Sequence, residues 1–530
     1  MVLTALAAAS LAVAQDPSKA ELAAQAMLSA SPDSALIATL EKLPGEHLQL
    51  SRAFTDAAEQ ATGARVAQAQ MVAAGEIVRR EKGVFDPELY GTAGWSGTDT
   101  PAASLFAGAE VLETETANFE AGARMRLKIG TELTASLNSN RLATNSAFAS
   151  LNPEYPAYGA LTLRQPLLKG FGPSARSDLS FAERHYDAAS ARYNNAVLAV
   201  RTDVETLYWQ LYAAERNHAV TTIIRDRAEA FLADTQLRAK AGMIGPSQVA
   251  NADFFLTEAE QALLDTEEQL DAISDRLASL MGRRPQALRY RATDEPPREF
   301  QIVDQDTLVA MTMRHNPELQ ALARDAQAIR ALEHGAAWDA RPTLDLLGSL
   351  GGNGLSGSPQ DVYFPGNPDP VRTDVNGGRS DSVNDVIKQT YPTWNVGVVF
   401  ALPIGRREGK GERDRLSAEV VRAEQQLLSA QRRLEEEVRA QHREIVRGRR
   451  RLELAVRGTN ASIRQVDIGL LEYRNGRTTA FEVVRLAADL ATAQQRYSEA
   501  LVRTARAAAV LRQLTGGWYS ATPTNTDSGQ

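Results

Sequence analysis

The chain repeats itself. The segment from Val204 to Gly282 returns without a gap as Val438 to Gly516, at a constant offset of 234 positions (438 minus 204). Within it, Gly242 falls on Gly476. Self-similarity at a fixed offset means that one structural unit is built twice. We therefore expect two copies of a unit that runs helix, strand region, very long helix, turn and helix.

The repeat sets the expected domain boundaries. The first copy takes residues 51–282 and the second takes residues 301–516. Within them we expect strands in about 85–166 and 342–403, and helical hairpins in about 174–282 and 410–516. The remaining parts are an N-terminal segment (15–50), a linker rich in proline and charge (283–300) and a C-terminal tail (517–530).

An apolar stretch opens the chain. Residues 2–14 read VLTALAAASLAVA and end in the A-x-A pattern Ala12-Val13-Ala14. About 13 apolar residues are too few to cross a bilayer as a helix, so the pattern favours a secretory signal peptide in residues 1–14. A buried N-terminal helix is the alternative. No Lys or Arg precedes the stretch, which is the pattern expected if the given start lies downstream of the true one.

Two very long helices are expected. Residues 174–240 contain neither proline nor glycine, which allows a rod of about 100 Å. Apolar residues recur in them at the 3.5-residue spacing of a coiled-coil seam, as Val200, Val204, Leu207 and Leu211 show. A second helix after each glycine turn would pack antiparallel on the first.

The strand regions alternate between apolar and polar residues. In residues 119–137 and 394–402 every second residue except Thr131 is apolar, which indicates a sheet with one wet and one apolar face. On strands alone, a membrane β-barrel and an ordinary sandwich domain stay equally open. We expect about two spanning strands per copy. Four strands cannot close a barrel, so spanning strands would require an oligomer. A turn near Gly130 would split 119–137 into a hairpin and make the strand count of the first copy even.

Several function classes are excluded or disfavoured. The chain has no cysteine, so it holds neither disulfides nor thiolate metal sites. Its net charge of −8 argues against a nucleic-acid partner. We find no P-loop, nucleophile elbow or HExxH motif, and the six histidines are scattered, so neither an enzyme nor a metal or cofactor site is expected.

Motif order and spacing from about residue 50 to 516 resemble the TolC-type outer-membrane factor family, also called outer membrane efflux proteins. The features that carry the resemblance are Asn316-Pro317-Glu318-Leu319, the segment LTLRQPLLKGFG (161–172) and the two hairpin tips, LRAKAGMIGPSQVANA (237–252) and LEYRNGRTTAFEVVRLA (471–487). The resemblance implies an α+β membrane protein. It would be a homotrimer whose chains share a transmembrane β-barrel of twelve strands in outer-membrane lipid, continued by a coiled-coil α-helical barrel. Residues 15–50 and the helices would lie in the periplasm, and the loops 98–117 and 361–388 would be extracellular.

The resemblance also implies partners and a gate. The hairpin tips would contact a periplasmic adaptor protein, which joins the duct to an inner-membrane transporter. The tip residues are Gly242, Ser247, Gly476, Thr478 and Thr479. Relatives often place an acidic gate residue six positions after the tip glycine, which corresponds to Gln248 and Glu482 here, with a further gate position at Arg485. The alternative is that Glu482 and Arg485 form an ordinary exposed helical pair.

Two functions of different classes follow. The first is an outer-membrane exit duct of a tripartite efflux pump or type I secretion system. The second is a secreted or periplasmic coiled-coil scaffold without channel activity.

Overall fold

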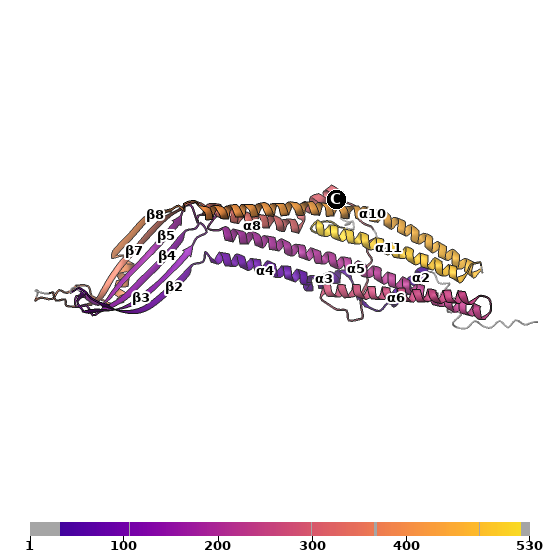
Figure 1. Ribbon diagram of the computed structural model, residues 1–530, viewed down its shortest axis with the longest axis horizontal. Helices are drawn as coiled ribbons and strands as arrows, with labels where there is room; N and C mark the ends of the chain where they lie inside the picture. Colours follow the sequence, from indigo (N-terminus) through magenta and orange to yellow (C-terminus); the bar gives the residue numbers. More distant parts are fainter. Residues whose placement is uncertain (1–31, 105–106, 298, 365–367, 476, 521–530) are drawn as a thin grey trace, which may run out of the picture. The chain divides into compact units, whose positions relative to one another are not determined.

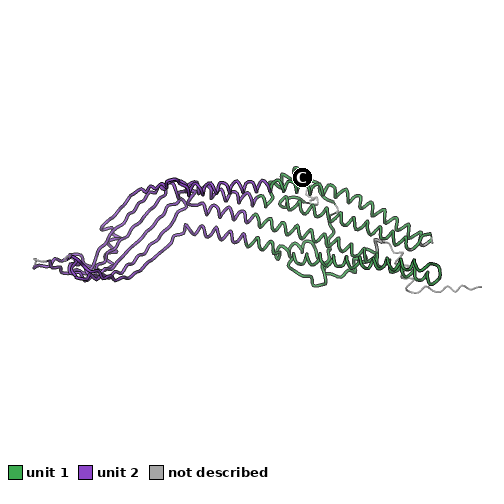
Figure 2. The backbone as a smooth tube through the Cα atoms, viewed as in Figure 1, with its two compact units in different colours: residues 1–69, 191–319, 430–530 green, residues 70–190, 320–429 purple. Residues whose placement is uncertain are grey.

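The computed structural model describes residues 32–104, 107–297, 299–364, 368–475 and 477–520 (Figure 1). They form two compact units (Figure 2). Unit 1 takes residues 1–69, 191–319 and 430–530, and unit 2 takes residues 70–190 and 320–429. Each point at which the chain passes from one unit to the other lies inside a helix. The expected signal peptide, 1–14, lies outside the described residues, as does the first part of the segment 15–50.

Unit 2 contains one six-stranded sheet, in the order β2-β3-β4-β5-β7-β8 (Figure 1). Every neighbouring pair is antiparallel, so β2 and β8 are its two edges. The strands are β2 (Glu88–Pro101), β3 (Val111–Arg126), β4 (Glu132–Thr144), β5 (Leu151–Pro166), β7 (Thr343–Pro359) and β8 (Tyr391–Ala401).

The expectation of about two strands per copy holds for the second copy and is wrong for the first. The first copy contributes four strands to the sheet and the second contributes two. The alternating stretch 119–137 is broken by a turn in which Leu127 N donates to Thr131 O at 2.8 Å and Gly130 has a φ of +95°. Glycine adopts that φ without the steric cost that other residues meet. The predicted turn near Gly130 is therefore confirmed, and the hairpin β3–β4 is part of the sheet.

The expected loops are shorter than 98–117 and 361–388. β2 continues to Pro101 and β3 begins at Val111, while α9 (Arg379–Lys388) occupies the end of the second range. α9 packs on the sheet at glycines. A Cβ on Gly159 would lie 2.7 Å from Cγ1 of Val386, and one on Gly354 would overlap the carbonyl oxygen of Ser382. These glycines let the helix backbone approach the strands closely.

The long helices have the following bounds: α4 (Thr62–Gly83), α5 (Ser177–Lys240), α6 (Pro246–Met281), α8 (Pro317–Asp339), α10 (Arg407–Arg474) and α11 (Ala480–Leu514). In unit 1, α5 and α6 form an antiparallel hairpin, because His218 Nδ1 meets Thr266 Oγ1 at 3.4 Å. α10 and α11 form a second one, because Thr504 lies against Gly448 and Thr459 Oγ1 donates to Ala493 O. Seam residues such as Val204, Leu211, Val438 and Ile445 are buried.

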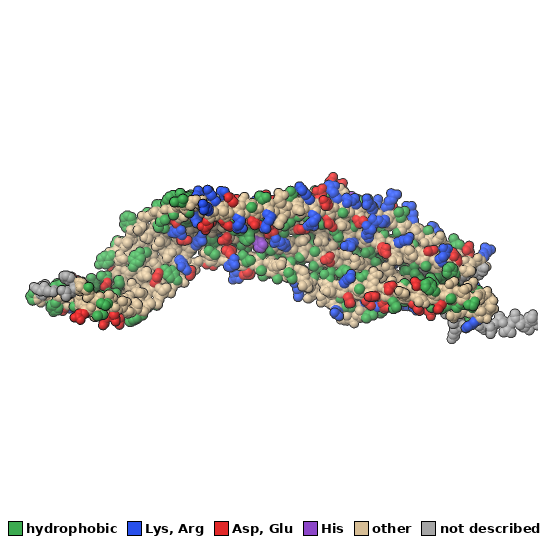
Figure 3. All heavy atoms as spheres, in the orientation of Figure 1, with side chains coloured by type: hydrophobic (Ala, Val, Ile, Leu, Met, Phe, Trp, Pro, Cys, Tyr) green, Lys and Arg blue, Asp and Glu red, His purple; other side chains and the backbone are tan. Residues whose placement is uncertain are grey.

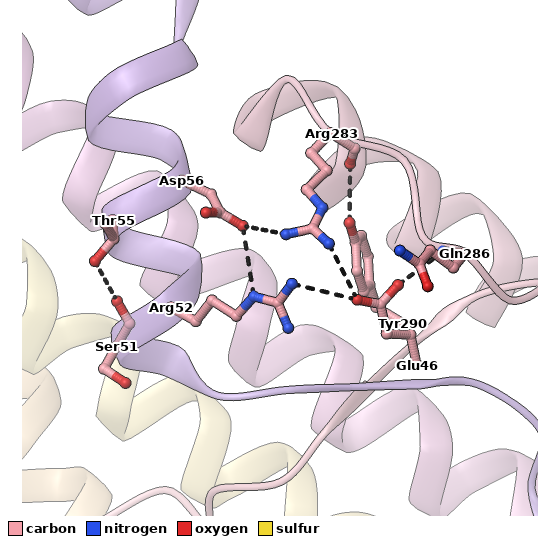
Figure 4. Close-up of polar contacts among 8 residues, drawn as sticks. All are labelled: Glu46, Ser51, Arg52, Thr55, Asp56, Arg283, Gln286 and Tyr290. Carbon is pink, nitrogen blue, oxygen red and sulfur yellow. Dashed lines mark hydrogen bonds and ion pairs between the residues drawn. The ribbon is translucent and has the colours of Figure 1, made fainter.

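The shorter elements of unit 1 are α2 (Pro32–Lys42), β1 (Glu46–Leu48), α3 (Leu50–Gln60), β6 (Tyr290–Ala292) and α7 (Gln305–His315). β1 and β6 pair in parallel, so residues 290–292 of the expected linker fold against the N-terminal segment. Figure 4 shows the ion pairs that hold them. Arg283 lies 3.6 Å from both Glu46 and Asp56, and Arg52 reaches the same two carboxylates.

Two buried polar side chains of α5 anchor this small sheet. Glu215 Oε1 accepts a hydrogen bond from Ala292 N at 2.7 Å. Burial raises the pKa of Glu215 to about 7. The Tyr208 hydroxyl accepts bonds from Thr293 N and Asp294 N, each at 3.0 Å, and burial raises its pKa to about 12. The α5 helix thus satisfies backbone groups that a three-residue sheet would leave unpaired.

Candidate functional site

The first hairpin tip, in unit 1, is a glycine turn. α5 ends at Lys240, and Gly242 follows with a φ of +76°. Gly242 N donates to Ala239 O at 3.0 Å and Met243 N to Arg238 O at 2.9 Å. This is the Schellman pattern, which satisfies the last carbonyls of a helix through a left-handed glycine. The predicted tip glycine of the first copy therefore lies at the reversal between α5 and α6.

The second tip has equivalent hydrogen bonds at the positions given by the repeat. Arg477 N donates to Glu472 O at 2.9 Å, which corresponds to the bond from Met243 to Arg238. Gly476 itself lies outside the described residues. Thr479 is the N-cap of α11, and its hydroxyl accepts a bond from Glu482 N at 3.4 Å. Thr478 lies in the turn before it, half-buried, and Ser247 is exposed at the start of α6.

The two expected gate positions occupy the same place in the second helix of each hairpin. Gln248 N donates to Gly245 O at 3.2 Å, and Glu482 N donates to Thr479 O at 3.1 Å. Both backbones are thus at the third helical residue. Since Gln248 is neutral and Glu482 is an acid, the two tips differ in charge although their backbones correspond.

Glu482 is paired within its own chain. Arg485 Nε donates to Glu482 Oε2 at 3.1 Å, with a second bond between Nη2 and Oε1. The hydrogen bond from Arg485 lowers the pKa of Glu482, and the same bond raises the pKa of Arg485. Both side chains are partly exposed, so the pair can exchange with other charged partners at small cost.

Aromatic packing joins the two hairpins near their tips. The rings of Phe231 on α5 and Phe481 on α11 lie 5.9 Å apart. Val484, next to the gate positions, is buried against Ala230 and is contacted by Phe231 and Phe255. The start of α11 is therefore held by residues of the first copy, and Glu482 and Arg485 stand on a packed element.

The sheet of unit 2 has an apolar face and a polar face. Residues that pair directly in an antiparallel ladder point to the same side. Leu89, Trp95, Trp394, Val398 and Phe400 on the apolar face are each at least 64% exposed. In full, the residues we assign to this apolar face are Leu89, Ala93, Trp95, Phe119, Ala121, Ala123, Leu133, Ala135, Leu137, Leu161, Leu163, Leu346, Leu350, Trp394, Val396, Val398 and Phe400.

The opposite face carries hydrogen-bonding and charged side chains. Arg164 donates to Glu132 at 3.0 Å and to Asp345 at 2.7 Å, which links β4, β5 and β7. Arg124 pairs with Glu88 at 2.8 Å between β3 and β2. The rows beyond them carry Glu120 and neutral polar residues, namely Thr92, Ser96, Asn118, Thr134, Ser136, Asn138, Thr162, Ser349 and Asn353. This face is suited to water.

The described residues hold no group of three or more His, Cys, Asp and Glu side chains that could bind a metal ion. Within the same residues, no helix combines the length and the apolar character needed to cross a bilayer. Sequence reasoning missed β4 beyond residue 138 and the helix α9.

Comparisons with known proteins agree with this geometry. The family model described as outer membrane efflux protein matches residues 120–283. No curated protein sequence matches the chain. Among solved structures, the outer-membrane channel OprN has a TM-score of 0.61 at 17% identity, covering 89% of this chain and 90% of that one.

Two further channels have a similar fold. The Campylobacter jejuni outer-membrane channel CmeC has a TM-score of 0.58 at 14% identity, over 89% of this chain and 86% of that chain. The outer-membrane protein VceC of Vibrio cholerae has a TM-score of 0.59 at 14% identity, over 89% and 97%. The predicted resemblance is confirmed: the chain is similar to the outer membrane efflux proteins in sequence over residues 120–283, and it has the fold of outer-membrane channels along most of its length.

Proposed function

We propose that the chain is one protomer of an outer-membrane exit duct, which passes substrates from a periplasmic adaptor and an inner-membrane pump or type I secretion system to the outside. The observation that carries the proposal is the sheet of unit 2. Large apolar side chains on one face are exposed on β2, β3, β5, β7 and β8, while the other face is polar. Figure 3 shows hydrophobic side chains along the part of the surface that Figure 1 labels β8.

The proposal requires more than one copy. β2 and β8 have a free edge in the isolated chain. In hydrocarbon each unpaired backbone group costs several kcal/mol, so only a closed sheet is stable there. Copies related by rotation can pair β8 of one with β2 of the next, because an even number of strands keeps this pair antiparallel. A homotrimer in outer-membrane lipid, as the resemblance implies, meets this requirement.

The alternative is a coiled-coil scaffold without channel activity. It would have to leave the apolar face in water, where contiguous patches of this kind are rare on monomeric proteins. Fractionation separates the two. A duct is expected in the outer-membrane fraction, extractable only with detergent, and should conduct ions in a planar bilayer. Recovery of a stable monomer from the soluble periplasmic fraction would refute the duct.

We further propose that Glu482 and Arg485 act in a gate at the end of the duct. In a trimer, three copies of Glu482 near the axis would favour cations in a narrow pore. The variant Glu482→Gln is expected to lower cation selectivity, and Gln248→Glu to raise it. Glu412→Gln is the matched control, since Glu412 also pairs with an arginine three residues on, at 2.7 Å. Equal selectivity in all three variants would refute the gate.

The tip turns are proposed to contact the adaptor. Thr478 lies in the second tip turn, and Ser247 is the second residue of α6, just after the first tip turn. Both can offer hydroxyl groups to a partner. A photo-cross-linking residue at either position should capture an adaptor in cells, whereas one at the exposed Glu268 in the middle of α6 should not. Capture from all three positions alike would argue against a docking role for the tips.

A further inference from the structure

The hairpin β3–β4 is built into the sheet, not appended to it. β2 and β3 pair continuously from Glu88–Arg124 to Pro101–Val111, and β3 and β4 from Arg126–Glu132 to Thr114–Thr144. β4 then pairs with β5 from Glu132–Arg164 onward. β2 reaches β5 only through these two strands. If the hairpin left the sheet, β2 and β5 would each have an edge whose backbone N–H and C=O groups lack partners.

The hairpin also has the side chains that a barrel wall needs. The part of its apolar face formed by Phe119, Ala121, Leu133, Ala135 and Leu137 carries no charge, whereas Glu115 and Arg141 pair on the same face farther from the β3–β4 turn. Its other face carries Asn118, Glu120, Ser136 and Asn138. β2 and β5 show the same alternation of apolar and polar residues on the corresponding faces of the sheet. A hairpin that projected into water outside the wall would have no reason to keep a wholly apolar band at the level of its neighbours.

We infer that β3–β4 is an insertion in the wall of the channel, so that three chains of six strands enclose an 18-stranded outlet in place of the expected twelve. This inference rests on the proposed trimeric duct. With strands about 4.8 Å apart and tilted by about 40°, eighteen strands give a backbone diameter of about 36 Å and twelve give about 24 Å. Barrels of 16–18 strands leave an aqueous channel. The hairpin therefore sets the size of solute that the outlet admits.

Cysteine pairs test the edge that the inference predicts. The chain has no cysteine of its own, so only introduced pairs can form disulfides. One set combines Val396→Cys in β8 with Gly91→Cys, Ala93→Cys or Trp95→Cys in β2. A matched set combines Val396→Cys with Ala135→Cys or Leu137→Cys in β4. Oxidation in outer membranes should join three chains covalently in at least one pair of the first set and in none of the second.

The outcomes separate the inference from the proposed function. Cross-links from β4 to β8 would mean that β2 and β3 leave the wall, which overturns the inference and leaves the trimeric duct standing. No cross-link from either set, in a protein that still migrates as a trimer after amine cross-linking, also overturns it. A protein that is monomeric by amine cross-linking refutes both.

Deleting residues 111–144 gives a second measurement. Because β2 and β4 run in the same direction, β2 can then take the place of β4 beside β5, and three chains of four strands remain. Polyethylene glycols added to the outer side of a planar bilayer enter the outlet according to their size. The deletion should reduce the outlet cross-section about twofold and so lower the size cut-off. An unchanged cut-off in a conducting variant would overturn the inference.

Discussion

Glu215 should make the stability of unit 1 depend on pH, and the substitution Glu215→Gln should remove that dependence. Burial raises the pKa of this carboxyl from 4.5 to about 7. A group with a raised pKa in the folded state stabilises fully below its unfolded pKa, and the contribution is lost as pH rises through the folded one. A pKa rise of this size corresponds to about 3 kcal/mol of unfolding free energy. This stabilisation is lost between pH 4.5 and pH 8.

The glutamine variant isolates this effect. Its amide oxygen can still accept the bond from Ala292 N, while all other titrating groups are common to both proteins. Denaturant unfolding in detergent, followed at pH 4.5, 6, 7 and 8, should show the variant gaining about 3 kcal/mol over the wild type as pH rises. Glu268→Gln, at an exposed position on α6, is the control and should gain nothing. A wild-type-to-variant difference that stays constant with pH would refute the reasoning.

Three further substitutions test the packing. Gly354→Ala should release α9 and expose it to protease, because the added Cβ overlaps the helix backbone, whereas Gly348→Ala in the same strand meets open space and should change nothing. Arg512→Ala should destabilise unit 1 by about 3 kcal/mol in thermal unfolding, since it leaves the buried carboxylate of Glu205 without its cation at 2.6 Å; a shift under 0.5 kcal/mol would contradict this. Tyr208→Phe should cost about 1–3 kcal/mol, because two backbone donors lose their acceptor; an unchanged unfolding midpoint would contradict it.

The sequence predicts the helices better than the strands, for a physical reason. A helix of more than sixty residues without proline or glycine has few alternatives, and its seam repeats many times. The break at Gly130 is hidden, because Leu127 and Leu133 are an even number of positions apart. The two-residue alternation therefore passes through the turn unchanged, and the expectation of a turn near Gly130 rested on the even strand count that it gives the first copy.

The helix α9 was missed because its own sequence is poor in helix formers. Residues 379–388 read RSDSVNDVIK, in which serine, aspartate and asparagine favour turns. The helix is held by contacts with Gly159 and Gly354, which are far away in sequence. Of the candidate site, the position of Gln248 and Glu482 within their helices followed from the repeat. The pairing of Glu482 with Arg485 inside one chain was expected as the alternative to the gate, and the structure shows that the pair forms.

The correspondence of the two tips has a consequence for symmetry. The backbone bond between Met243 N and Arg238 O recurs between Arg477 N and Glu472 O, so the proposed ring of three chains would present this bond six times. Gln248 and Glu482 make one position of this ring alternate between a neutral and an acidic side chain. A partner that recognises the backbone would find six equivalent sites, whereas a partner that recognises the charge would find three. A single adaptor could thus bind the same rim in two inequivalent ways.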